Sequence, residues 1–218
     1  MRGADLGVGN AGERKVKIGV LGGTFDPVHL GHVAMAEEAR KALGLAEVIF
    51  VPAGQPMLKS VDRVITPAGQ RVEMLRLATI GKPHLKISSI EIERPGPSYT
   101  VDTLEAITNR YGRKAGIYFI LGWDSLAQLA DWREPERIVA MCRLVAVPRP
   151  GYPRPDLEAL EKKIPGISRK VTFIDKPNLD ISATMIREKV RKGETIEGLV
   201  PGLVAEYIKK HHLYREQE

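Results

Sequence analysis

The sequence predicts an α/β protein in which helices cover both faces of a doubly wound parallel sheet of about five to six strands. Three observations support this prediction. Short β-branched runs alternate with helical patterns, and one run, AGIYFILG, is apolar throughout, as a central parallel strand should be. The chain has 218 residues and is 43% apolar, so it can bury a large core. Two helical patterns at the end of the chain predict a C-terminal helical subregion.

The first half of the chain contains three strand–helix pairs. Pro67 is expected at the first position of the second helix, and Ser98 is expected to be the N-cap of the third. The expected strands are 16–22, 46–52 and 85–93, and the expected helices are 29–43, 67–79 and 99–110.

The second half contains three further strands, expected at 115–122, 142–147 and 170–175. A proline-rich, charged stretch between the last two predicts a surface excursion with one short helix. Ser182 is the expected N-cap of a helix that stops at Gly193, and Pro201 stands near the start of the last helix.

Composition excludes several classes of protein. The single cysteine, Cys142, excludes a disulfide framework and lies in an apolar run, which predicts a small buried side chain and a reducing compartment. No stretch reaches the roughly 20 apolar residues of a membrane span, and residues 1–15 read as a flexible extension rather than a secretion signal. A cytoplasmic protein is expected. The net charge of +6 would attract phosphates or nucleic acid without distinguishing them.

In parallel sheets, ligands bind at the carboxyl ends of the strands. This rule directs attention to the loops after Leu21, Val51, Leu121 and Asp175. The first of these loops begins the string GGTFDPVHLGH, residues 22–32. Its two glycines either allow a ligand to approach the backbone or simply form the turn, and taken alone they favour the turn.

The string also contains two histidines, His29 and His32, on one face of the first helical turn. That end of a helix attracts anions through its free amides and its dipole, which predicts a phosphate site. Three other interpretations stay open at this point: a metal site, which would need further ligands, a histidine pair packed in the core, and a general base.

GGTFDPVHLGH resembles the signature of the nucleotidylyltransferase superfamily, and the longer pattern is similar to the bacterial nicotinate mononucleotide adenylyltransferases. Four further segments match in order: VPAGQPMLK (51–59), PSYTVDTL (97–104), LGWDSLAQLADW (121–132) and ISATMIR (181–187). The resemblance covers about Lys17 to Tyr214 and implies a Rossmann-like fold, with residues 16–218 forming one nucleotidylyltransferase domain. It implies transfer of the adenylyl group of ATP to nicotinate mononucleotide, giving deamido-NAD and pyrophosphate in NAD biosynthesis.

The resemblance also implies an ATP site. The histidines and an arginine would contact the phosphates, an aspartate would hold the ribose, and backbone atoms would meet the rest of the nucleotide. The residues implied are Gly22, Gly23, Thr24, Phe25, His29, His32, Gly122, Asp124, Ile181, Ser182 and Arg187. Asp124 could also be a helix N-cap, and Ala183 replaces a serine of the family pattern.

For the acceptor, the resemblance implies that Trp132 stacks on the pyridine ring and that the backbone amides of Thr100 and Arg133 bind its carboxylate. Lys59, with Gln55, would bind the mononucleotide phosphate. The family commonly has P-P-H-K where this chain has P-M-L-K, so Leu58 stands at the histidine position. The implied catalytic groups are His29, His32, Lys59 and Arg187.

The attacking phosphate is already an anion at pH 7, so no base is needed, and catalysis reduces to alignment and charge neutralisation. Mg²⁺ is expected to enter with ATP, without dedicated protein ligands. ATP and nicotinate mononucleotide are the expected partners, and binding to nucleic acid or to a membrane is not expected. The sequence leaves open whether the protein forms a homo-oligomer. The alternatives are another acceptor, such as nicotinamide mononucleotide or phosphopantetheine, or a non-catalytic nucleotide-binding protein.

Overall fold

The computed structural model describes residues 15–55, 64–112 and 114–215. Within these ranges six strands form one parallel sheet in the order β3-β2-β1-β4-β5-β6. The strands are β1 (Lys17–Gly23), β2 (Glu47–Pro52), β3 (Leu85–Ile87), β4 (Gly116–Gly122), β5 (Arg143–Val147) and β6 (Val171–Phe173). The doubly wound sheet predicted from the sequence is confirmed.

The strand order places a topological switch point between β1 and β4. The chain builds outward from β1 to β3, then returns to the other side of β1 to add β4. The chain segments that leave β1 and β4 cross to opposite faces of the sheet. A crevice therefore opens at the carboxyl ends of these two strands. The GG turn after β1 and the LGWD turn after β4 both lie at this crevice.

Helices cover both faces of the sheet. One core cluster contains residues of α1 (Leu30–Leu43), α2 (Ala68–Thr79), α8 (Ala183–Arg191) and α9 (Gly202–Lys210). The other contains residues of α4 (Thr100–Tyr111), α5 (Trp123–Ala127), α6 (Pro135–Met141) and α7 (Leu157–Lys163). Successive β1 side chains alternate between the clusters, because Val20 joins one and Leu21 the other.

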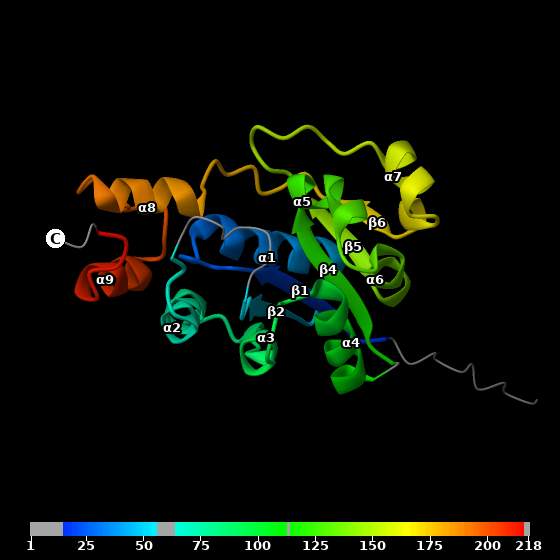
Figure 1. Cartoon of the computed structure of the whole chain (residues 1–218), viewed down its shortest axis with the longest axis horizontal. Helices are drawn as coiled ribbons and strands as arrows, with labels where there is room; N and C mark the ends of the chain where they lie inside the picture. Colours follow the sequence, from blue (N-terminus) through cyan, green and yellow to red (C-terminus); the bar gives the residue numbers. More distant parts are fainter. Residues whose placement is uncertain (1–14, 56–63, 113, 216–218) are drawn as a thin grey trace, which may run out of the picture.

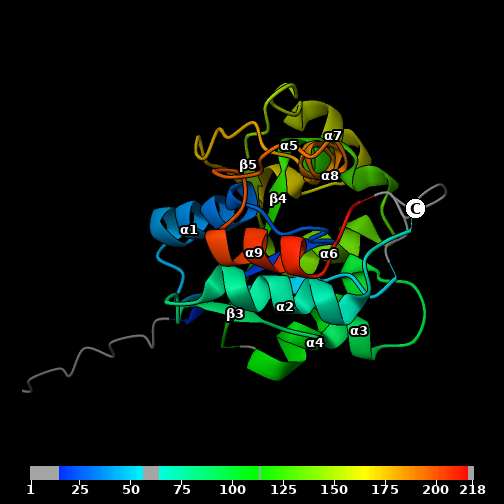
Figure 2. The ribbon, with the colours of Figure 1, turned by 90° about the vertical axis from the view of Figure 1, so that its left-hand side faces the viewer.

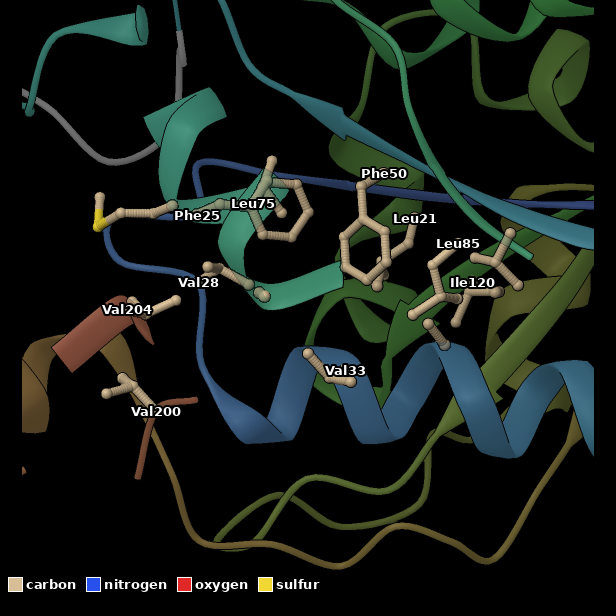
Figure 3. Close-up of a cluster of buried hydrophobic side chains, with 14 of the residues drawn as sticks. Leu21, Phe25, Val28, Val33, Phe50, Leu75, Leu85, Ile120, Val200 and Val204 are labelled. Carbon is tan, nitrogen blue, oxygen red and sulfur yellow. The ribbon is translucent and has the colours of Figure 1, made fainter. Parts of the chain in front are cut away.

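The predicted C-terminal helical subregion is present. Figure 1 shows α8 and α9 together at one end of the molecule, and α9 packs against α2, next to which it is seen in Figure 2. Figure 3 shows how the core continues into this subregion, with Val200 and Val204 on the same side as Val28 and the aromatic rings of Phe25 and Phe50 beyond it. The end of the chain is therefore packed against the loop that follows β1.

Three details of the sequence prediction are wrong. The expected strand 85–93 ends at Ile87, and 90–93 form the one-turn helix α3 (Ile90–Glu93), which is too short to reveal a helical period. Pro67 precedes α2 as its N-cap instead of occupying its first position. Tyr99 is the N-cap of α4, while the Ser98 hydroxyl accepts hydrogen bonds from elsewhere.

Other local predictions are confirmed. The Ser182 Oγ caps α8 by accepting a hydrogen bond from the Met185 amide at 3.1 Å. The surface excursion contains α7 and a 3-10 turn at Ile167–Arg169. Cys142 is buried, and burial raises the pKa of its thiol to about 12.

Among the residues with described positions, none of the helices combines the length and the apolar character that a membrane span needs.

Candidate active site

One cavity of about 660 Å³ opens at the crevice, within the range of small-molecule sites. Its walls come from the loop after β1, the start of α1, the β4–α5 turn and the start of α8. All the residues predicted to bind ATP line it, namely Gly22, Gly23, Thr24, Phe25, His29, His32, Gly122, Asp124, Ile181, Ser182 and Arg187.

The two histidines form a stacked pair in this cavity. Their ring centroids lie 3.7 Å apart, and the rings are inclined by 26°. The His29 amide donates to His32 Nδ1 at 3.3 Å, so a neutral His32 ring carries its proton on Nε2 and can donate it to another group. His29 is only 7% exposed, but one side of its ring meets the other imidazole instead of hydrocarbon.

Gly31 makes this stacking possible. A Cβ atom at that position would lie 3.0 Å from His29 Nδ1 and 3.1 Å from His29 Cε1, tighter than such contacts normally allow. A side chain there would require the His29 ring to shift by a few tenths of an ångström. The glycine between the histidines thus leaves room for the His29 ring in its present position.

The start of α1 offers fewer free amides than the sequence predicted. The Leu30 amide donates to the Leu199 carbonyl at 2.9 Å, and the His32 amide bonds to the His29 carbonyl at 3.0 Å. Both amides are therefore occupied within the fold. The groups at this end that face the cavity are therefore mainly the imidazoles, with less of the backbone than expected.

Arg187 reaches this loop from α8. Its Nη1 donates to the Asp26 carbonyl at 2.7 Å, and its Nη2 donates to Thr184 Oγ1 at 3.1 Å. The Asp26 carboxylate in turn accepts a hydrogen bond from the Tyr214 hydroxyl at 2.7 Å. Burial, reinforced by the nearby Asp26 carboxylate, raises the pKa of Tyr214. Arg187 on α8 thus holds the backbone of Asp26, and Tyr214, in the turn after α9, holds its side chain.

Asp124 lies in the first turn of α5, whose N-cap is Gly122, so the alternative role of Asp124 as an N-cap is wrong. Its Oδ2 accepts from Arg149 Nη1 at 2.6 Å, whereas its buried Oδ1 has no hydrogen-bond partner within the described part of the chain. A Cβ at position 122 would lie 2.4 Å from Oδ1, so a larger residue there would force this carboxylate to move. A ligand hydroxyl could satisfy Oδ1.

The residues predicted to bind the acceptor are less closely grouped. Trp132 lines the cavity, and its ring meets Phe119 edge-on with 6.1 Å between centroids. Gln55, Thr100 and Arg133 do not line it. Lys59 lies outside the described residues.

Two contacts nevertheless connect the acceptor segments. The Arg133 guanidinium lies over the Tyr99 ring, 4.5 Å from its centroid, which brings the segment after Trp132 to the start of α4. Ser98 Oγ accepts from the amides of Gly54 and Gln55 at 3.0 and 3.3 Å. The loop after β2 is thereby attached to the same helix start.

Glu91, in α3, lies next to both Ser98 and Gly54. Thr103 Oγ1 donates to Glu91 Oε1 at 2.6 Å, and burial raises the pKa of the carboxyl group. A Cβ at Gly54 would lie only 2.2 Å from the Glu91 carbonyl oxygen. The glycine in VPAGQ therefore lets the β2 loop pack directly on α3.

Sequence reasoning missed three polar residues at or near the site: Asp26, Arg71 and Arg149. Arg149 follows β5, and the strand-end rule would have found it if the loop after Val147 had been included. Arg71 shares a helix face with Leu75 and Ala78, so a charge within an apolar stripe was its signal. Nothing in the sequence marked Asp26 as a site residue except its position within GGTFDPVHLGH.

Comparisons with known proteins agree with this geometry. The model of the cytidylyltransferase-like family matches residues 20–189. A probable nicotinate-nucleotide adenylyltransferase of Dehalococcoides mccartyi is 47% identical over 202 residues, covering 93% of this chain and 98% of the relative. One of Thermomicrobium roseum is 43% identical and covers 93% of each chain.

The chain belongs to the nicotinate-nucleotide adenylyltransferase family. It is a nucleotidyltransferase, and the family resemblance seen in its motifs is confirmed. Among solved structures, Plasmodium falciparum nicotinic acid mononucleotide adenylyltransferase complexed with NaAD has a TM-score of 0.75 at 22% identity, covering 91% of this chain and 97% of that one. This likeness confirms the Rossmann-like fold.

Proposed function

We propose that the chain transfers the adenylyl group of ATP to nicotinate mononucleotide, giving deamido-NAD and pyrophosphate. One observation gives the strongest support. The stacked imidazoles of His29 and His32 line the same cavity as the Arg187 guanidinium, although α1 and α8 are far apart in sequence. Groups that donate to phosphate thus converge at a switch point, where a nucleotide is expected. The names of the relatives support the same reaction.

In this proposal the triphosphate lies against the loop after β1. His32 donates from Nε2, because its Nδ1 is occupied by the His29 amide. Arg187 is already held by the Asp26 carbonyl, so its guanidinium loses little freedom when it binds phosphate. Asp124 would accept a ribose hydroxyl at Oδ1, the buried oxygen without a described partner.

The acceptor phosphate attacks the α-phosphorus of ATP, the bond between that phosphorus and the oxygen that joins it to the β-phosphorus breaks, and pyrophosphate leaves with that oxygen. The attacking oxygen carries a negative charge at pH 7, so the step releases no proton and needs no base. The protein contributes alignment of two polyanions and neutralisation of the charge that develops on the leaving group. Imidazole and guanidinium donors suit this task, and Lys59 would add a cation on the acceptor side.

Mg²⁺ would enter as the Mg–ATP complex and lower the charge repulsion between the substrates. Within residues 15–55, 64–112 and 114–215 no group of three or more His, Cys, Asp or Glu side chains is placed to hold a metal ion. The donor set at the cavity fits a metal whose ligands are phosphate oxygens and water. We also propose that the reaction takes place in the cytoplasm.

We propose that the nicotinate form of the acceptor is preferred. Trp132 would stack on the pyridine ring, and the amides of Thr100 and Arg133 would bind its carboxylate. The contact between Arg133 and Tyr99 supports this arrangement, because it holds the two segments together and adds a cation next to them. Amide donors and a cation favour a carboxylate over a neutral carboxamide.

The test is to incubate the protein with Mg–ATP and each of three acceptors, which are nicotinate mononucleotide, nicotinamide mononucleotide and phosphopantetheine. Release of pyrophosphate and formation of the adenylylated product are measured. Deamido-NAD should form with the highest kcat/KM. Equal kcat/KM for the two mononucleotides would contradict the carboxylate assignment, and ATP binding without any turnover would favour a non-catalytic nucleotide-binding protein.

A further inference from the structure

Arg71 is a buried arginine outside the cavity. It lies in the first turn of α2, is only 2% exposed, and is the largest fully buried side chain of the described residues. An arginine removed from water needs hydrogen-bond partners, because an unsatisfied buried charge is strongly unfavourable. The partners of Arg71 therefore indicate what this position does.

The guanidinium donates to backbone carbonyls of three separate segments. Its Nη1 binds the Thr24 carbonyl at 2.8 Å, its Nη2 binds the Ala53 carbonyl at 2.8 Å, and its Nε binds the Thr66 carbonyl at 2.9 Å. Thr24 belongs to the loop after β1, and Ala53 directly follows β2. Thr66 and Ala53 are also at the two ends of the connection between β2 and α2.

These loops lie on the two substrate sides of the proposed reaction. Gly23 and Thr24 line the cavity at which ATP would bind. Ala53 is followed by Gly54 and Gln55, whose amides are attached to Ser98 on the acceptor side. One direct hydrogen bond also joins the loops, from the Ala53 amide to the Gly23 carbonyl at 2.9 Å.

We propose that Arg71 is a positioning residue that holds the ATP-side loop and the acceptor-side loop at a fixed separation, so that the two bound phosphates meet in line. This proposal rests on the proposed adenylyl transfer. Arg71 touches neither substrate and acts through Thr24 and Ala53. The pairing of β1 with β2 and the Ala53–Gly23 hydrogen bond bring the two loops together, and in this proposal Arg71 adds the contact that fixes their separation.

The geometry requires arginine. Nη1 and Nη2 belong to one rigid plane and point to carbonyls of different loops, so the guanidinium sets the spacing between them. A lysine has a single nitrogen on a flexible stem and cannot reproduce this fork. Arg71→Lys therefore keeps the positive charge but loses the fixed distance between the two carbonyls that the guanidinium binds.

The relative position of two reacting groups affects the chemical step more than it affects the binding of either ligand alone. A misplacement of about 1 Å can lower a rate by about 10²-fold. Loss of Arg71 should accordingly lower kcat with both substrates saturating, while the Kd of each substrate measured separately changes little. A residue that only stabilises the fold would not produce this split once the variant is folded.

The experiment compares wild type, Arg71→Lys and Arg71→Met with the control Arg76→Lys. Arg76 lies on the same helix, is exposed and forms a surface ion pair with Glu73. Deamido-NAD formation gives kcat, calorimetry gives the Kd of ATP and of nicotinate mononucleotide, and circular dichroism at 10 °C confirms that each variant is folded. If Arg71→Met is not folded, the comparison of Arg71→Lys with wild type alone tests the proposal.

We expect kcat of Arg71→Lys to fall at least tenfold, with each Kd within about threefold of wild type. Arg76→Lys should behave as wild type. A folded Arg71→Lys with normal kcat would overturn the proposal, as would a loss confined to Kd, or unfolding of both Arg71 variants at 10 °C. Failure of the wild type itself to form deamido-NAD would instead refute the proposed function.

Discussion

His32 combines two tasks that substitution can separate. Its Nδ1 accepts the His29 amide at 3.3 Å at the start of α1, and its Nε2 is the donor assigned to phosphate. Loss of the first contact should cost about 1 kcal/mol, as loss of a helix cap does, and lower Tm by about 2–4 °C for a chain of this size. Loss of the donor should lower kcat by about 10² or more, which corresponds to about 2.7 kcal/mol.

Three variants distinguish these effects. His32→Ala removes both contacts and should lose activity and about 1 kcal/mol of stability. The amide of an asparagine lies near the position of Nδ1, so His32→Asn should keep the stability and lose the activity. The longer glutamine side chain brings its amide near the position of Nε2, so His32→Gln should keep more activity than His32→Asn.

The assays are initial rates of pyrophosphate release with both substrates saturating and urea unfolding followed by circular dichroism. The reasoning is refuted if His32→Asn turns over at a rate near that of wild type, because the Nε2 donor would then be dispensable. A loss of activity that follows stability across all three variants would also contradict it, since His32 would then act only through α1.

Other contacts give three further predictions. Asp124→Ala should lower kcat/KM for ATP by about tenfold to a hundredfold, as loss of a hydrogen bond to a charged group does, with KM for the acceptor unchanged in the same assay. Tyr214→Phe should lower the free energy of unfolding by about 1 kcal/mol, because the buried Asp26 carboxylate loses a donor, whereas the control Tyr207→Phe on α9 should not. Burial raises the pKa of Glu91, so the folded protein holds the carboxyl proton more tightly than the unfolded chain does. The free energy of unfolding of wild type should therefore fall, relative to that of Glu91→Gln, as the pH rises from about 4.5 through the raised pKa. An equal pH dependence of urea unfolding for the two proteins would contradict this last prediction.

The sequence predicted the parts of the molecule that depend on local pattern. Apolar runs and strand-end loops were sufficient for the doubly wound sheet and for the position of the cavity. Most ATP-side residues lie just after a strand or at the start of a helix, where a single rule applies. The cap at Ser182 followed equally well from residue type.

Features that depend on contacts between distant segments were not predictable in this way. Ser98 has the chemistry of an N-cap, but its hydroxyl is used by the amides of Gly54 and Gln55, more than forty positions away. The Leu30 amide is taken by Leu199, from the last part of the chain. The role of Arg71 depends on three backbone carbonyls that come close together only in the folded chain.

The most direct test of the account uses ATP that carries one sulfur at a chiral α-phosphorus, with nicotinate mononucleotide as acceptor. If both substrates are held in one cavity and the acceptor phosphate attacks directly, there is a single in-line displacement, and the configuration at phosphorus is inverted in the product. Retention of configuration would mean two displacements through a covalent adenylyl-enzyme. It would contradict the claim that the protein acts only by aligning two polyanions and neutralising their charge.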